Sequence, residues 1–196
     1  MSFNRAVAAH EAAHAVCGVA VGRRVSEITL DPPDDECSGW CIFDTSIRHS
    51  PIQAMHDLYV MVSLVGGELG EALAAVADVE CPTKERGIAR RHCVNKLAPA
   101  LGVDGEWLYA LVETVARNVL TINRVQFDSL RWWLERERKL DGDQIALICA
   151  GLRTVNLTRS IICRLPHKAL EPHHKTLVVA GRYAGENQSN LLSTKG

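Results

Sequence analysis

The segment His10-Glu11-Ala12-Ala13-His14 has residue types and a spacing that suit metal chemistry. Residues four apart lie on one face of an α-helix, so His10 and His14 can direct their imidazole groups at one ion. Zinc binds imidazole nitrogen at about 2.0–2.1 Å, and this spacing permits that geometry. Glu11 projects beside such a metal, where its carboxylate could take a proton from water. The pattern predicts a catalytic zinc site with Glu11 as the general base.

The motif lies inside an apolar segment. Residues 5–22 are rich in alanine and end at Gly22, which predicts a helix closed by a glycine cap. Three unpaired polar side chains would be costly to bury in such a helix, and a metal ion would satisfy all three. This argument favours a metal site over an accidental pair of histidines. The same polar groups, and the short length of the run, argue against a membrane span.

The composition excludes several classes of protein. The chain has 196 residues, which suits one domain, and 47% of them are hydrophobic, which supports a real core. A net charge of -1 gives no reason to expect nucleic acid or a membrane as a partner. The seven cysteines form an odd number and no secretory signal is visible, so we expect reduced thiols and a cytoplasmic location.

The remaining pattern predicts a mainly α-helical fold with a small β-hairpin or sheet. The Gly66-Gly67 pair falls inside one expected helix and predicts either a bend or a close helix contact. The expected strands are 25–30 and 39–43, and the further helices are 51–76, 82–97, 104–120, 123–139 and 144–151, with a break at 99–104 and a turn with a helix cap at 140–143.

Several segments resemble the peptidase domain of FtsH-type ATP-dependent zinc metalloproteases. Residues 9–16 are similar to that family's His-Glu-Ala-Gly-His-Ala motif, with Ala13 in place of glycine. The segments that resemble its next strand, its Gly-Gly helix and its closing helices follow in the family's order: 25–32, 64–73 and 123–145. The resemblance implies a peptidase domain at 1–152 and a C-terminal extension at 153–196, whose polar end we expect to be mobile.

The resemblance also implies a set of zinc ligands. The family uses the two motif histidines and an Asp near the start of the helix that follows the Gly-Gly helix. Glu85 occupies the matching position, and its side chain is one methylene longer than that of Asp. Asp78 and Glu80 are nearby alternatives to Glu85. A carboxylate at a helix N-terminus is also common without a metal, because it is favoured by the helix dipole.

The resemblance also implies roles for two further sets of residues. Glu71 matches a family glutamate near the metal, where it would either hold a ligand in place or be a ligand itself. A solvated carboxylate on a helix surface is the alternative. The segment Gly39-Trp40-Cys41 begins a strand that could bind an extended substrate by strand addition, as the family's edge strand does. An ordinary buried strand is the alternative.

The function implied is that of a zinc-dependent endopeptidase acting on flexible or unfolded protein or peptide substrates. The family's ATPase module is not expected here, since the motif helix starts almost at residue 1. The chain would therefore be independent of ATP by itself. Self-association and a separate ATPase partner are both compatible with the resemblance.

Two other hypotheses compete with that of a zinc-dependent endopeptidase. A catalytically silent binding or regulatory module would keep the fold, but it would have no need to retain Glu11 as a base. A structural zinc or redox site could instead use Cys37, Cys41, Cys81 and the pair His92-Cys93. The sequence contains no Cys-x-x-Cys pair, and small buried cysteines are common in protein cores, which weighs against this alternative.

Overall fold

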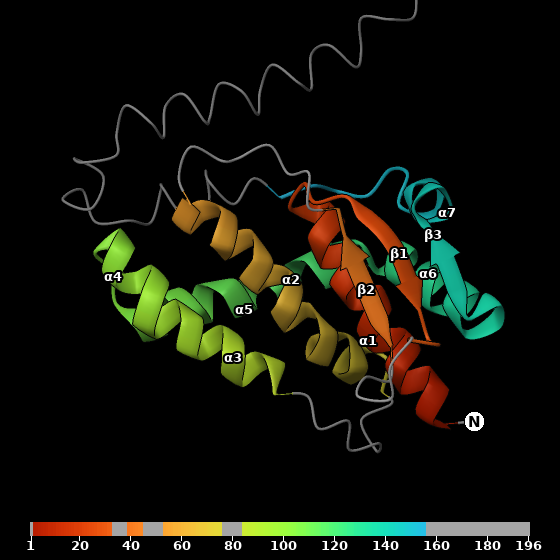
Figure 1. Cartoon of the computed structure of the whole chain (residues 1–196), viewed down its shortest axis with the longest axis horizontal. Coiled ribbons are helices and arrows are strands. Elements are labelled where there is room, and N and C mark those ends of the chain that lie inside the picture. The colour runs from red at the N-terminus through yellow and green to blue at the C-terminus, as the bar shows by residue number, and fades with distance from the viewer. Residues whose placement is uncertain (1, 33–38, 45–52, 76–83, 156–196) are drawn as a thin grey trace, which may run out of the picture.

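The computed structural model describes residues 2–32, 39–44, 53–75 and 84–155. These residues form a mainly helical fold with a small antiparallel sheet, as predicted (Figure 1). The elements in chain order are α1 (Ser2–Ala20), β1 (Val25–Thr29), β2 (Trp40–Phe43), α2 (Gln53–Leu73), α3 (Glu85–His92), a π-helical turn (Cys93–Leu97), α4 (Ala98–Leu101), α5 (Gly105–Ile122), α6 (Arg124–Glu137), β3 (Lys139–Asp141) and α7 (Gly142–Ile148).

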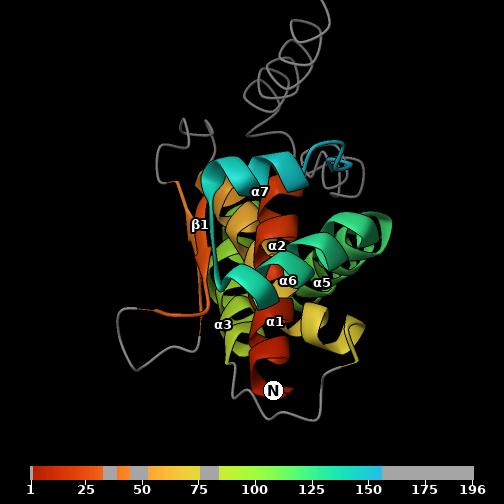
Figure 2. The same ribbon diagram turned by 90° about the vertical axis from the view of Figure 1, so that its right-hand side faces the viewer.

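Helix α1 is the central element, and it contacts α2, α5, α6 and the sheet (Figure 2). The alanines of α1 are buried, and their small side chains let the neighbouring elements approach closely. A Cβ at Gly70 of α2 would lie 2.3 Å from the Cβ of Ala13. A Cβ at Gly66 would lie 2.8 Å from the sulfur of Cys17. The Gly-Gly helix therefore makes the close contact predicted as one of two options, and Gly70 leaves the room that Ala13 needs.

The sheet has the order β2-β1-β3, and both pairs of strands are antiparallel. Ile28 in the central strand pairs with Cys41 of β2 on one side and with Leu140 of β3 on the other. The prediction of only a turn and a cap at 140–143 was therefore wrong in part, because Leu140 is buried in a strand. Asp141 does cap α7, and it forms a capping box with Gln144.

The helical segment that begins with α3 continues further than predicted. A break was expected from residue 99, but the chain remains helical to Leu101. The π-helical turn precedes Pro99, and the backbone N–H of Ala98 donates to the carbonyl of Cys93 instead of to the residue four positions back. This wider turn accommodates a proline that an α-helix interior would not tolerate.

Helices α5 and α6 pack against α1 and complete the core. Phe127 and Leu108 are fully buried there. The buried side chain of Asn123, between the two helices, donates to the carbonyl of Arg153 and accepts from its backbone N–H. The first residues of the predicted extension, Arg153 to Val155, therefore still contact the core after α7. The remainder of the predicted extension lies outside the described residues.

The helices also bear on the expected absence of a membrane span. Within the four described ranges, no helix combines the length and the apolar composition needed to cross a membrane.

Candidate metal centre

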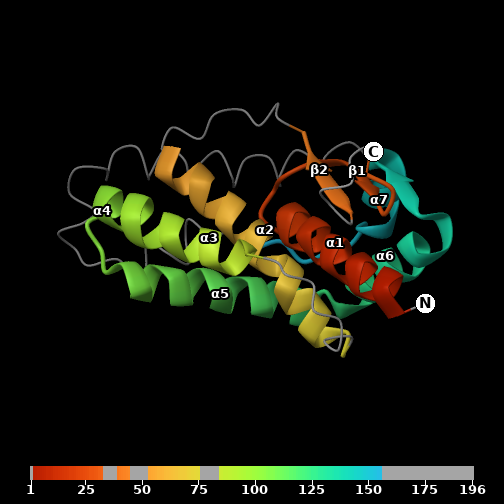
Figure 3. The same ribbon diagram turned by 60° about the horizontal axis from the view of Figure 1, so that its bottom comes forward.

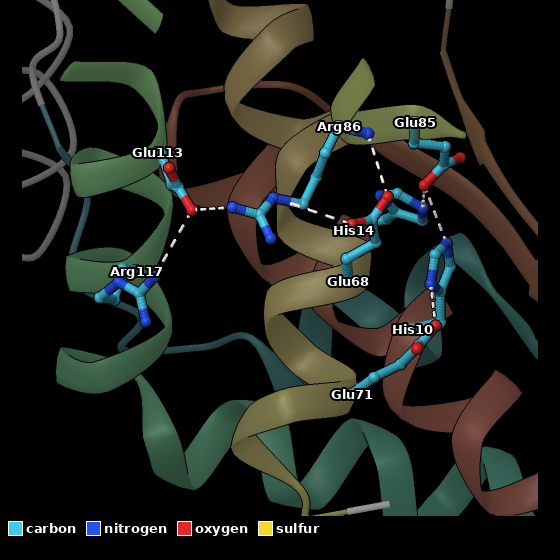
Figure 4. A network of polar contacts seen from close by, with 8 residues as sticks. All are labelled: His10, His14, Glu68, Glu71, Glu85, Arg86, Glu113 and Arg117. Atoms are coloured by element: carbon cyan, nitrogen blue, oxygen red, sulfur yellow. Dashed lines mark hydrogen bonds and ion pairs between the residues drawn. The ribbon is translucent and has the colours of Figure 1, made fainter. Parts of the chain in front are cut away.

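His10, His14 and Glu85 form a possible metal-binding triad, which we call the triad below. The two histidines lie on one face of α1, and Glu85 is the first residue of α3 (Figure 4). One carboxylate oxygen of Glu85, Oε2, lies 3.0 Å from His10 Nε2 and 3.2 Å from His14 Nε2. Among the residues that the structure describes, no other cluster of His, Cys, Asp and Glu has this arrangement.

The second nitrogen of each imidazole is held by α2. His10 Nδ1 lies 2.5 Å from a carboxylate oxygen of Glu71, and His14 Nδ1 donates to the carbonyl of Ser63 at 2.8 Å. A carbonyl oxygen can only accept, so the proton of a neutral His14 lies on Nδ1. The Nε2 atoms are therefore the ones directed at Glu85. Histidine ligands of metals are oriented in this way in proteins.

The donor set of the triad fits a metal cation. Glu85 Oε2 is buried and accepts no hydrogen bond, although two imidazole nitrogens lie close to it. In a neutral imidazole with its proton on Nδ1, the lone pair of Nε2 faces the carboxylate oxygen, which is unfavourable unless a cation lies between them. Tetrahedral zinc with bonds of about 2.0–2.2 Å separates its ligand atoms by roughly 3.4 Å, close to the two distances observed. Two histidines and a carboxylate also match the protein ligands of one class of catalytic zinc site.

The charged groups of the triad stabilise one another in their charged forms. Burial by itself would lower the pKa of His10, but the hydrogen bond to Glu71 and the contact with Glu85 raise that pKa to about 10. Burial would likewise raise the pKa of Glu85, but the two histidines hold it at about 2. The position between the three residues therefore favours positive charge, whether a proton or a metal ion supplies it.

Glu11 lies next to the triad without belonging to it. The side chain is buried, and burial raises the pKa of its carboxyl group, while His14 and His10 act in the opposite direction. The backbone of Gly39 passes directly over it, since a Cβ at Gly39 would lie 2.9 Å from Glu11 Cγ. Glu11 is thus enclosed between α1 and the start of β2.

A pocket of about 510 Å³ opens beside the triad, and we call it the site pocket. Glu11, His14 and Glu85 line it, as does β2 together with Gly39. Strand β2 is at the edge of the sheet, and only β1 pairs with it among the described strands. The predicted substrate-binding segment, Gly39-Trp40-Cys41, therefore shares a pocket with the predicted base and with two of the three predicted ligands.

The other predicted site residues have different positions. Glu71 contacts His10 Nδ1, behind the ligand nitrogen, and is not part of the triad. Asp78 and Glu80 lie outside the described residues, as do Cys37 and Cys81. Cys41 and Cys93, the described cysteines of the alternative site, are free thiols, and neither they nor His92 belong to a metal cluster of the described chain.

A network around Arg86 holds the start of α3, where Glu85 lies, and no pattern in the sequence indicates this network. Helix α3 lies alongside α2 and α5 (Figure 3). Glu68 of α2 accepts from the backbone N–H of Arg86 at 3.0 Å, which satisfies a free donor at the helix start. The Arg86 side chain forms an ion pair with Glu113 of α5, which also lies 3.5 Å from Arg117 (Figure 4). The residue after Glu85 is therefore tied to both neighbouring helices.

Ser63 and Gly67 are the other contributors that the sequence analysis did not assign to the site. Ser63 acts through its backbone carbonyl, which any residue type supplies, so no sequence signal marks it. Gly67 faces both imidazole rings, and its place in the Gly-Gly pair was a signal for close packing but not for the metal.

The family resemblance rests on the motif segments, and the triad contains the two motif histidines and the predicted carboxylate. Neither the arrangement of these residues nor the fold names a family by itself. Comparison with models of known protein families finds no match for the chain, and comparison with curated proteins finds none either.

Proposed function

We propose that this chain is a zinc-dependent endopeptidase related to the FtsH-type peptidase domain. The observation that carries the proposal is that His10, His14 and Glu85 converge beside Glu11 in a pocket bordered by an edge strand. A structural metal site has no use for an adjacent free carboxylate or for an open pocket.

The triad would hold the zinc ion through His10 Nε2, His14 Nε2 and a carboxylate oxygen of Glu85. Bound zinc supplies Lewis-acid chemistry, which activates water and polarises a carbonyl group. Glu71 and the Ser63 carbonyl orient the two imidazoles and keep their Nδ1 atoms protonated.

Glu11 is the group that moves protons in this proposal. Its carboxylate accepts a proton from the water that attacks the peptide carbonyl, and then delivers that proton to the amine that leaves. The enclosure of Glu11 under Gly39 places it beside β2, where an extended substrate would pair with the strand. Flexible or unfolded chains suit this site, because a folded substrate cannot present an extended segment to a strand edge.

The test combines metal content and peptide hydrolysis in three proteins. Wild type should bind about one zinc per chain, His14→Ala should lose it, and Glu11→Gln should keep it. Glu11→Gln should also lower the rate of hydrolysis by roughly 10²–10⁴-fold, the usual contribution of a general base. Elemental analysis and mass spectrometry of a denatured model substrate give the two readouts.

The results separate this proposal from its alternatives. Metal binding without hydrolysis in wild type would favour the silent binding module. Zinc that survives His14→Ala would move the metal to the cysteines. Equal hydrolysis by wild type and Glu11→Gln would refute the role given to Glu11.

A further inference from the structure

Arg23 occupies a defined position at the end of α1. The backbone N–H of Arg23 donates to the carbonyl of Gly18 at 2.8 Å, and that of Gly22 donates to Val19 at 3.0 Å. Gly22 has a positive φ of 86°. This is a Schellman motif, in which the residue after the left-handed glycine is fixed relative to the helix. The Schellman motif at Gly22 therefore fixes the backbone position from which the Arg23 side chain extends.

The guanidinium of Arg23 lies on an aromatic surface. Its central carbon lies 3.7 Å from the centroid of the Phe43 ring, within the range of a cation–π contact. The ring itself is wedged against α1, since a Cβ at Gly18 would lie 2.1 Å from Phe43 Cε1. A fixed ring under the guanidinium orients its plane and leaves the N–H groups at the edges to bind a partner.

Arg23 has no anionic partner among the described residues. Its Nε atom is buried without a hydrogen bond, and burial lowers the pKa of the guanidinium. Arg86 and Arg138 each form ion pairs with carboxylates. A partly buried cation without a counter-charge is unfavourable, and buried donors are normally paired. The described residues thus supply no anion to Arg23. Arg23 lines two pockets, one next to α7 and the site pocket, and only the site pocket is also lined by the edge strand β2, where an extended substrate would lie.

Arg23 and Glu11 mark two separate places along the site pocket. Gly39 contacts Glu11 at one end of β2, and Phe43 contacts Gly18 at the other. Four residues of strand span roughly 13 Å, and the seven residues from Glu11 to Gly18 span roughly 10 Å of helix. An extended peptide rises by about 3.3 Å per residue, so this separation corresponds to three or four residues of substrate.

We propose that Arg23 determines specificity by binding a carboxylate of the peptide substrate, three or four residues from the bond that is cleaved. The planar fork of arginine matches a carboxylate with two parallel hydrogen bonds. The carboxylate is either an internal Asp or Glu side chain or the free C-terminus of the peptide. This inference rests on the proposed function, because the spacing is counted from the Glu11 end of the pocket.

The experiment measures binding and cleavage separately. Zinc-loaded Glu11→Gln protein is titrated into fluorescently labelled neutral peptides in which a single Glu replaces Gln at successive positions. Fluorescence anisotropy should show one register in which Glu strengthens binding by about ten- to a hundredfold, the range for a hydrogen bond to a charged group. Mass spectrometry of products from wild type then gives the distance from that Glu to the cleaved bond.

Variants assign the preference to Arg23. Arg23→Gln in the same background should remove the preference for Glu, and Arg23→Lys should keep only part of it, because ammonium lacks the planar fork. Arg24→Gln is the matched control, since Arg24 is exposed and does not line the site pocket. Melting temperatures check that each variant is folded. Peptides that end at the preferred position, with a free or an amidated C-terminus, distinguish the two sources of the carboxylate.

The results distinguish failure of the Arg23 proposal from failure of the peptidase proposal. Cleavage with no preference for Glu, or a preference that survives Arg23→Gln, overturns the role of Arg23 and leaves the peptidase proposal standing. Binding of Glu-containing peptides that depends on Arg23, with no cleavage by wild type, overturns the peptidase proposal and leaves the carboxylate site. Absence of binding to every peptide overturns both.

Discussion

At the scale of single residues, the triad depends on Gly67, because the lack of a side chain there leaves room for the two imidazole rings. A Cβ at Gly67 would lie 2.5 Å from His10 Nε2 and 2.7 Å from His14 Cε1. Both imidazoles would have to move, and they are held by Glu71 and the Ser63 carbonyl. We expect Gly67→Ala to lower zinc affinity by about tenfold or more, the size of effect seen when histidine ligands lose their orientation. Competition with a fluorescent zinc chelator measures this affinity.

Gly87→Ala is the control for this prediction. Gly87 is also helical, and a Cβ there would meet only the Arg91 side chain, at 3.5 Å. Alanine at this position should keep zinc affinity and raise stability by about 0.4–1 kcal/mol, because it restricts the unfolded chain. Unchanged zinc affinity in Gly67→Ala would mean that the imidazoles do not need the space that glycine leaves.

The sequence predicted part of the site because part of it is local. His10, Glu11 and His14 are related by the period of one helix, which spacing alone reveals. Glu85 is brought to them by tertiary packing, and it was placed through the family resemblance and not through periodicity. Arg23 carries no motif, and its role follows only from its contact with Phe43 and from the site pocket.

At the scale of elements, the position of Glu85, the proposed third ligand, depends on the start of α3. The Arg86 side chain joins α3 to α5 through Glu113, next to Glu85. We expect Arg86→Ala to lower zinc affinity by up to about tenfold, less than the loss of a direct partner of a ligand, because Arg86 acts through the backbone. Its effect on stability should stay within about 1 kcal/mol, since the pair is partly exposed. Calorimetric titration with zinc and thermal melting give the two values.

Arg90→Ala is the matched control in the same helix. Arg90 also joins α3 to α5, through two hydrogen bonds of 3.0 and 2.7 Å to Glu106, but it lies more than a turn beyond Glu85. We expect its removal to leave zinc affinity unchanged. Equal losses of zinc affinity in the two variants would indicate general loosening of α3 and not a local role of Arg86.

The sequence predicted those elements whose structure depends mainly on their own residues and not on contacts with distant parts of the chain. Composition and the Gly22 cap predicted α1 within a few residues of its observed bounds, and α5 and α6 were predicted as closely. Strand β3 was missed because three residues are too few for a period, and its pairing is set by β1 far away in the sequence. The break at Pro99 was expected too early, since a π-helical turn is not visible in a sequence pattern.

At the scale of the whole molecule, the triad connects parts of the chain that are distant in sequence. Its ligands come from α1 and α3, and α2 supplies the contacts behind the histidines. None of these elements holds the site alone, so the unfolded chain should bind zinc much more weakly than the folded protein. A ligand that binds only the folded state stabilises it by an amount that depends on its concentration relative to Kd.

Removal of zinc should therefore lower the melting temperature of the whole protein. With free zinc at a hundredfold excess over Kd, the stabilisation is about 2.7 kcal/mol, which corresponds to a shift of roughly 5–11 °C for a chain of this size. Differential scanning calorimetry with a chelator, followed by restored zinc, measures the shift. His14→Ala is the control and should melt at the same temperature with and without zinc. A wild-type melting temperature that does not respond to zinc, or a response that persists in His14→Ala, would show that the triad is not the zinc site that stabilises the fold.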